Sequence, residues 1–226
     1  MNPLRHDFIA ECLGDSYGNG DGLKYLDIGC GGGIFAESLA RTIPRSSTTK
    51  SVTAIDPSAT LIRIAREHTR TDPILDSLLR TGEFEYKNTT AEQHQGNIYD
   101  VVTLFEVLEH IDSSSPALFL QNCLRLVRPG GWLIGSTIAR SLPSFLVNRV
   151  IAEAPWPVGV VPRGTHDWNK FVNPAELRSW VSGNEQWRCN GVVYFPGLGW
   201  KFVPHSENWG NYFWGVRKTK KTFLSP

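Results

Sequence analysis

Apolar and polar positions alternate along residues 24–137 in a pattern that predicts strands and helices in turn. Short apolar runs rich in β-branched residues have the composition of strands buried on both faces. They lie at residues 24–28, 51–55, 84–87, 99–105 and 132–137. Between them, apolar residues recur at helical spacing, at residues 34–40, 58–68, 75–79 and 117–126. Strands alternating with helices predict an α/β fold with a doubly wound, mostly parallel sheet.

The pattern predicts further helices and strands near both ends of the chain. Residues 2–13 place leucine, phenylalanine and isoleucine at helical spacing, and Asn173-Pro174 begins a helix that runs to Val181. Residues 187–195 and 211–217 form two strands around a loop rich in Gly, Pro and Trp, as in an antiparallel hairpin that finishes the sheet. The prediction is therefore one domain over residues 1–226 with a seven-stranded sheet.

Residues 141–165, which follow the fifth strand, break the pattern. After residue 145, short apolar runs are interrupted by Pro155, Pro157, Pro162 and Trp156, and the segment carries Arg149 and Arg163. An amphipathic surface element of this kind fits a lid over an apolar substrate or a foot on a membrane surface. An ordinary buried helix followed by an irregular loop is the alternative.

Charge and cysteine content exclude several classes of protein. The chain has 226 residues, and 23 basic against 22 acidic residues give a net charge of +1, so it lacks the overall field that attracts nucleic acid. Four cysteines without a C-x-x-C pair argue against a disulfide scaffold or a zinc knuckle and favour a reducing compartment. No apolar run is long enough to span a bilayer, and no signal or transit peptide begins the chain. Either the protein has no such signal or this chain is a mature or trimmed form.

A glycine-rich turn joins the first strand to its helix. The strand ends at Asp27-Ile28, and glycines at 29 and 31–33 let the backbone turn sharply and a ligand approach closely. A dinucleotide-binding G-x-G-x-x-G motif starting at Gly29 would need glycine where Ile34 lies, which weakens the NAD interpretation. The series Asp27-x-Gly29-x-Gly31 resembles the loop of class I methyltransferases, which use S-adenosylmethionine.

A carboxylate also ends the next strand. Asp56 is placed to accept the two ribose hydroxyls of an adenosine, although Asp56-Pro57 can equally cap the helix that follows, and both roles can hold at once. Residues 89–92 follow the third strand. In the class I methyltransferases that the chain resembles, the turn at this point lies beside the adenine of the cofactor. Thr89 and Glu92 also have the spacing of a capping box.

Residues 99–111 combine a buried strand with three metal-type ligands. If the chain turns helical after Phe105, then Glu106, Glu109 and His110 fall on one helix face at the carboxyl end of the strand, where open α/β sheets bind ligands. Oxygen and nitrogen ligands without thiolate suit Mg²⁺, Mn²⁺ or Zn²⁺. A solvated helix face is the alternative.

Taken together, these segments resemble the ubiquinone-biosynthesis O-methyltransferases. The resemblance spans nearly the whole chain, in residues 2–5, 26–33, 99–111, 126–131, 164–167, 170–177 and 211–212. It implies cofactor contacts by Arg5, Gly29, Asp56 and Phe105. Asp27 and Gly31 of the glycine-rich loop are further candidates for cofactor contact. The resemblance also implies a divalent metal, with Mg²⁺ the first choice and Zn²⁺ or Mn²⁺ as alternatives, held by Glu106, Glu109 and His110.

Two departures from that family are visible. An aromatic and acidic segment that usually precedes the Asn2-Pro3-Leu4-Arg5 stretch is absent, and the insertion at 141–165 carries more prolines than the family's smoother helix. His166 is either a base or further ligand reaching the site, or is tied structurally to Asp167.

The resemblance implies the following function. The enzyme would methylate catechol hydroxyls of polyprenylated ubiquinone precursors, of the 3,4-dihydroxy-5-polyprenylbenzoate and demethylubiquinol type, with help from the metal. It would sit peripherally on the matrix side of the mitochondrial inner membrane through residues 141–165, within a ubiquinone-biosynthesis complex and without nucleic acid. Two rivals stay open: an RNA 2′-O-methyltransferase with a similar E-x-x-E-H cluster, and a non-catalytic binding protein on the same fold.

Overall fold

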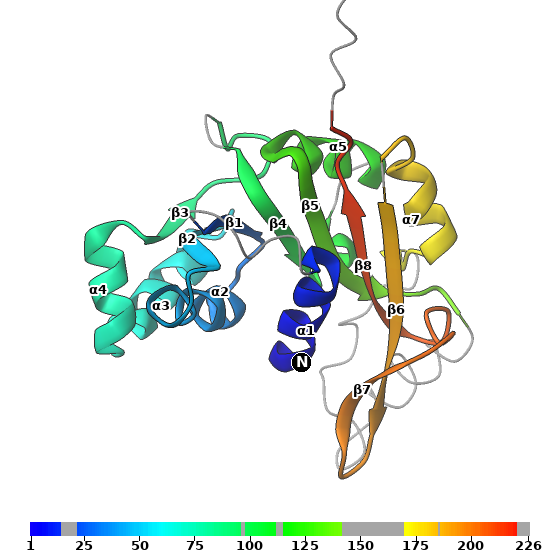
Figure 1. The fold of residues 1–226 in the computed structure, drawn as a ribbon, viewed down its shortest axis with the longest axis horizontal. Helices are drawn as coiled ribbons and strands as arrows, with labels where there is room; N and C mark the ends of the chain where they lie inside the picture. Colours follow the sequence, from blue (N-terminus) through cyan, green and yellow to red (C-terminus); the bar gives the residue numbers. More distant parts are fainter. Residues whose placement is uncertain (15–21, 96–97, 112–114, 142–169, 185, 221–226) are drawn as a thin grey trace, which may run out of the picture.

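A single twisted sheet runs through the whole molecule (Figure 1). The computed structural model describes residues 1–14, 22–95, 98–111, 115–141, 170–184 and 186–220. Eight strands lie in the order β3-β2-β1-β4-β5-β8-β6-β7. They are β1 (Leu23–Ile28), β2 (Thr49–Asp56), β3 (Phe84–Asn88), β4 (Tyr99–Phe105), β5 (Val127–Ile138), β6 (Gln186–Phe195), β7 (Gly199–Val203) and β8 (Asn211–Arg217).

The first five strands are parallel, as the sequence predicts. In β4 every residue except Asp100 is buried, and in β5 the run from Gly130 to Ile138 is buried throughout. Strands covered on both faces need this continuous apolar composition, which explains why they are recognisable from the sequence. Their carboxyl ends meet at one edge of the sheet.

The antiparallel end of the sheet differs from the prediction by one strand. β8 pairs antiparallel with both β5 and β6, as the predicted hairpin requires. The stretch between them is not only loop, because Gly199–Val203 returns along β6 as β7. Gly197 and Gly199 both take positive φ, and this lets the chain reverse in a tight turn. The sheet therefore has eight strands instead of seven.

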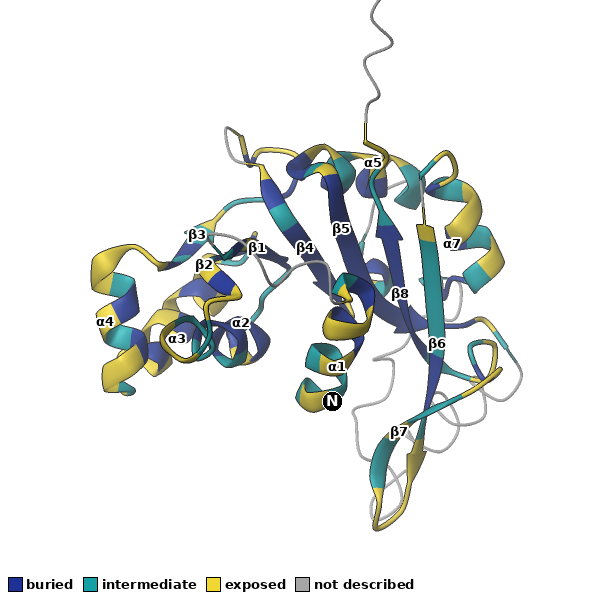
Figure 2. Ribbon diagram, viewed as in Figure 1, coloured by how far each residue is buried: buried dark blue, intermediate teal, exposed yellow. Residues whose placement is uncertain are grey.

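Helices cover both faces of the sheet, which confirms the doubly wound architecture. One core lies under α1 (Asn2–Leu13), α2 (Ile34–Ala40), α3 (Ala59–Thr69) and α4 (Pro73–Thr81). The other lies under α5 (Pro116–Leu126) and α7 (Pro174–Trp180). Figure 2 shows the buried strands between the half-exposed helices. A short 3-10 turn, η2 (Ile43–Arg45), precedes β2. No helix in the described part of the chain is long and apolar enough to cross a membrane.

Two local predictions are corrected. After β4 the chain does not turn helical at Glu106; the backbone there takes positive φ, and a single 3-10 turn, η3 (Leu108–His110), follows. Residues 89–93 form a turn and not a capped helix, with the amide of Gln93 donating to the Thr90 hydroxyl at 3.3 Å. His94, which follows this turn, is buried, and its Nε2 lies 2.9 Å from the hydroxyl of Tyr99.

Candidate active site

Two neighbouring cavities open at the carboxyl edge of the parallel strands. The larger, about 370 Å³, lies between the ends of β1 and β2, the turn at residues 89–92, and η3. The smaller, about 230 Å³, lies between α1, the glycine turn and the end of β4. Gly29, Glu106 and His110 line both cavities. The cavities therefore form one cleft at the place where sheets of this topology bind their ligands.

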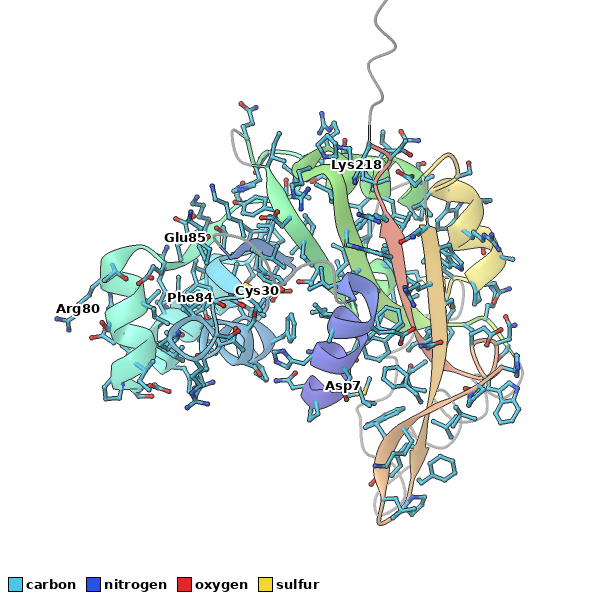
Figure 3. The ribbon with its side chains drawn as sticks, in the orientation of Figure 1. Asp7, Cys30, Arg80, Phe84, Glu85 and Lys218 are labelled. Carbon is cyan, nitrogen blue, oxygen red and sulfur yellow. The ribbon has the colours of Figure 1, made fainter. Side chains whose placement is uncertain are left out.

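The glycine turn is fastened to the tip of β2. Cys30, labelled in Figure 3, belongs to this turn, and its amide and that of Gly29 both donate to the carbonyl of Ile55. Asp56 accepts from the amide of Gly31 at 2.9 Å and from that of Ser58 at 2.8 Å, one bond on each carboxylate oxygen. The carboxylate lines the larger cavity, and an ionised carboxylate has lone pairs left for further donors.

Gly29 fits its place because it has no side chain. Its φ is +69°, and a Cβ there would lie 2.7 Å from Cγ2 of Val107. Since Val107 belongs to the turn after β4, the two turns that border the cleft pack against each other through this glycine.

Asp27 lies in the smaller cavity and is almost fully buried. Burial raises its pKa to about 6, although the hydroxyl of Thr103 donates to it at 2.7 Å and lowers the pKa in part. Asp27 and Thr103 are direct register partners on β1 and β4. A buried carboxyl with this pKa is suited to binding a cation, because a positive partner would restore its ionised form.

Arg5 of α1 reaches over the smaller cavity. Its guanidinium lies 5.0 Å from the ring centroid of Phe105 and 5.7 Å from that of Phe35. One amino group donates to the Asn2 side chain at 3.2 Å, and the other lies 3.5 Å from the Glu106 carboxylate. Its Nε is buried without a hydrogen-bond partner among the described residues. An anion entering this cavity would thus meet a positioned cation.

Glu106 occupies the point where the two cavities meet. Its φ of +59° is rare for a non-glycine residue and aims the side chain away from the direction that a helix would give it. The side chain is 48% exposed and makes its ion pair with Arg5. Unusual backbone geometry of this kind is common beside ligand sites.

Glu109 and His110 leave η3 in different directions. Glu109 is half-buried; its carboxylate accepts from the Thr137 hydroxyl at 2.9 Å and lines neither cavity. Burial raises the pKa of this carboxyl to about 7, against the lowering effect of its hydrogen bonds. His110 is exposed and lines both cavities.

These positions test the predicted metal site. In the described part of the chain, no three His, Cys, Asp or Glu side chains are grouped as metal ligands. Glu106 pairs with Arg5 and Glu109 faces Thr137, so the side chains that have the right donor atoms do not converge in this arrangement. The predicted convergence on one helix face is wrong because the helix does not begin at Glu106. Binding of a metal by Glu106, Glu109 and His110 stays a prediction.

The other predicted residues are mostly brought together. Arg5, Asp27, Gly29 and Phe105 line the smaller cavity, and Asp56 lines the larger one. Gly31 lines neither cavity; its amide instead holds Asp56. His166 and all of the 141–165 insertion except Ser141 lie outside the described residues.

Sequence reasoning missed the residues that act from neighbouring elements. Thr103 is the one polar residue within the apolar run 101–105 of β4, and that contrast was the available signal. Leu61 of α3 and Phe119 of α5 line the larger cavity, but their helical spacing marks them only as core residues.

Comparison with known proteins agrees with this geometry. A family model described as a methyltransferase domain matches residues 4–185. The chain is 41% identical over 201 residues to the ubiquinone biosynthesis O-methyltransferase of Salmonella arizonae, covering 87% of this chain and 74% of that protein. The protein of that name from Cronobacter sakazakii is 39% identical over 202 residues, with the same shares covered. The chain belongs to the ubiquinone biosynthesis O-methyltransferase family.

A eukaryotic member of the family also matches. The mitochondrial ubiquinone biosynthesis O-methyltransferase of Candida albicans is 36% identical over 222 residues, which cover 95% of this chain. The chain spans 64% of the length of that relative.

Solved structures share the fold at lower identity. Magnesium protoporphyrin IX methyltransferase from Synechocystis PCC 6803, solved with bound S-adenosylhomocysteine, superposes with a TM-score of 0.64 at 16% identity, covering 96% of this chain and 83% of that one. N-methyltransferase NodS from Bradyrhizobium japonicum WM9 superposes with a TM-score of 0.58 at 16% identity, covering 96% and 88%. The class I methyltransferase fold predicted from the sequence is therefore confirmed.

Proposed function

We propose that this chain transfers the methyl group of S-adenosylmethionine to a catechol hydroxyl of a polyprenylated ubiquinone precursor. The acceptors are of the 3,4-dihydroxy-5-polyprenylbenzoate and demethylubiquinol type. The observation that carries the proposal is the paired cavity at the carboxyl edge, with Arg5 and Asp27 in one part and Asp56 in the other. The names of the relatives support the reaction and the pathway.

The charges of the cleft match those of the cofactor. The methionine part of S-adenosylmethionine carries an ammonium and a carboxylate, which suit Asp27 and Arg5 respectively. The ribose hydroxyls suit Asp56, and the turn at residues 89–92 borders the same larger cavity, where the adenine would lie. When bound, the cofactor supplies an electrophilic methyl group on a sulfonium.

The remaining task of the chain is to present a deprotonated acceptor. A catechol hydroxyl is a weak nucleophile until it loses its proton. His110 and Glu106 line both cavities, so an imidazole and a carboxylate face the region that the acceptor would enter. Imidazole accepts protons readily near neutral pH, and correct positioning of the reacting groups supplies much of the rate.

Location and partners form part of the same proposal. A polyprenyl tail keeps the acceptor in a membrane, so the enzyme would work peripherally on the matrix side of the mitochondrial inner membrane, with other proteins of ubiquinone biosynthesis. The match to a mitochondrial relative supports the organelle, while bacterial relatives match equally well. Of residues 141–165, the predicted membrane contact, all but Ser141 lie outside the described residues.

A methyl-transfer assay tests the proposed reaction. Cofactor labelled on its methyl group is incubated with a prenylated catechol, with and without a chelator, and separately with structured RNA. Label in the catechol supports the proposal, and dependence on added Mg²⁺ would support the predicted metal. Label in RNA would favour the RNA methyltransferase, and cofactor binding without transfer to either acceptor would favour the non-catalytic protein.

A further inference from the structure

The β6–β7 hairpin extends past the sheet edge that carries the cleft (Figure 1). β6 runs parallel to β5 because both pair antiparallel with β8. Gly191 of β6 lies opposite Tyr212 of β8, which in turn lies opposite Thr137, one residue before the end of β5. Residues 193–195 therefore continue beyond the carboxyl end of β5, on the same side as the two cavities.

The base of this hairpin is anchored in the core. Val192 is buried, and its register partner Phe202 packs against Phe8 of α1 and Phe213 of β8, with ring centroids 6.2 Å and 5.5 Å away. Because side chains two residues apart share a face, the apolar face that begins at Val192 and Phe202 continues to Tyr194 and Trp200. These two rings form a cross-strand pair with centroids 5.5 Å apart.

The tip of the hairpin exposes apolar side chains to solvent. Residues 194–198 are all exposed, with Leu198 at 71%, Tyr194 at 56% and Phe195 at 41% (Figure 2). From residue 192 to residue 204 the sequence contains no acidic side chain, and its one charged residue is Lys201, which is exposed. The tip is therefore apolar, aromatic and weakly basic.

The backbone of the tip is already hydrogen-bonded. Residues 191–195 pair with residues 199–203, and the amide of Leu198 donates to the carbonyl of Phe195 at 3.0 Å. Exposed backbone groups are the main obstacle to entering an apolar medium, since each unsatisfied group costs free energy there. The hairpin avoids this cost for the groups that pair between β6 and β7, while the outward-facing groups of β7, the edge strand, are suited to the polar headgroup region.

We propose that this hairpin tip, residues 194–200, inserts into the interface of an anionic phospholipid bilayer and holds the catalytic edge of the sheet against the membrane. Tyr and Trp favour the boundary between headgroups and acyl chains, and Leu198 and Phe195 enter below it. Lys201 lies beside the tip and is attracted by anionic headgroups. The orientation toward a membrane-held acceptor rests on the proposed function, whereas the insertion itself does not.

Vesicle sedimentation of the full chain tests the insertion. The vesicles are phosphatidylcholine alone, or equal parts of phosphatidylcholine and phosphatidylglycerol. We expect the wild type to bind the anionic vesicles more tightly and to lose that advantage as salt is added. Leu198→Asp should weaken binding about tenfold, since it replaces an apolar side chain that would enter the bilayer by a charge. Lys201→Gln should weaken binding to the anionic vesicles alone, by about fivefold.

Ile74→Asp is the matched control. Ile74 is 45% exposed at the start of α4, at the opposite end of the sheet in Figure 1, and an acidic residue is tolerated in the first turn of a helix. It should bind vesicles as the wild type does. Phe195→Ser is the second tip variant if Leu198→Asp lacks the wild-type circular dichroism spectrum.

Three outcomes would overturn the proposal. The first is equal vesicle binding by the wild type and the folded tip variants. The second is a loss of vesicle binding in Ile74→Asp as large as that in the tip variants. The third is a wild-type dimer that the tip variants convert to a monomer while vesicle binding stays unchanged. The last would make the tip a contact between copies of the chain. Methyl transfer to a water-soluble catechol without a prenyl tail should be unchanged in Leu198→Asp. Its absence in the wild type would count against the proposed function and leave the vesicle result standing.

Discussion

The glycine turn and the turn after β4 border one cleft but hold their carboxylates differently. On the glycine side, Asp56 is fixed by two backbone amides and Asp27 by the Thr103 hydroxyl, and both side chains face the cavities. On the β4 side, Glu106 pairs with Arg5 and Glu109 turns away toward Thr137. The glycine side is thus preorganised for a ligand, while the β4 side has its charges engaged by other protein groups.

Replacing the η3 side chains should have the largest effect. We expect Glu109→Ala with His110→Ala to reduce methyl transfer at least about a thousandfold, the scale on which positioned proton carriers and metal ligands act. Cofactor affinity should change less than about threefold, because Asp27 and Asp56 are untouched. Single-turnover transfer of labelled methyl and calorimetric titration with the cofactor measure the two quantities separately.

The matched control is Asp76→Ala with Arg80→Ala. This pair on α4 is linked at 2.6 Å and lines neither cavity of the cleft; α4 lies beside β3, the edge strand at the left of Figure 1. It should leave both quantities unchanged. Parallel loss of turnover and cofactor affinity in the η3 variant would show that η3 supports the cofactor site as a whole.

Removing the Asp56 carboxylate should have the next largest effect, now on the glycine side. If Asp56 accepts both ribose hydroxyls as proposed, Asp56→Ala would lose two charge-assisted bonds, each worth roughly 1.5 to 3 kcal/mol. We expect cofactor affinity to fall at least about a hundredfold, measured by calorimetric titration. Asp56→Asn keeps one acceptor oxygen and should lie between the alanine variant and the wild type. Unchanged affinity in Asp56→Ala would mean that this carboxylate acts only on the Gly31 and Ser58 amides.

The glycine side could be predicted because strand pairing fixes where its residues lie. Asp27 and Asp56 stand at the carboxyl ends of adjacent parallel strands, so any fold with this sheet order brings them to one edge. The contact between Thr103 and Asp27 could not be predicted in the same way, since it depends on the register of β1 against β4.

The β4 side could not be predicted from spacing alone. The i, i+3, i+4 rule holds only within a continuous helix, and the positive φ of Glu106 comes between the strand and η3. Nothing in the sequence of this segment indicates that Glu106 takes a left-handed backbone conformation. Likewise, Gly199–Val203 resembles a loop, and it becomes a strand because the turn at Gly197 returns it to β6.

The pH dependence of stability should include a contribution from Asp27, which the Asp27→Asn variant separates from that of Glu109, whose pKa burial also raises. The pKa of Asp27 in the folded protein is about 6, above the ordinary value of 3.8, because burial favours the neutral acid. The folded state therefore binds the proton more tightly than the unfolded state does. The contribution of Asp27 is fully present below pH 3.8 and is lost as pH rises through about 6.

The expected loss is roughly 3 kcal/mol between about pH 4 and pH 7, at 1.36 kcal/mol for each unit of pKa difference. Asp27→Asn cannot titrate and keeps an oxygen for Thr103, so its free energy of unfolding should lack this component. Urea denaturation of both proteins across that range gives the difference directly. A constant difference between them at every pH would show that Asp27 stays ionised in the folded protein.

The smallest effect should come from two glycines that differ only in their surroundings. Gly29 and Gly31 both take positive φ, but a Cβ at 29 would lie 2.7 Å from Val107 while one at 31 meets nothing within 4 Å. Gly31→Ala should cost only the roughly 1 to 2 kcal/mol of the left-handed backbone. Gly29→Ala should cost about 1 to 3 kcal/mol more, because the added methyl overpacks the contact between the two turns. Unfolding free energies of the two variants measure this difference, and in the Val107→Ala background the excess should disappear. If the two alanine variants are equally stable, the turn after β4 yields to the methyl, and the two sides of the cleft are not held together through Gly29.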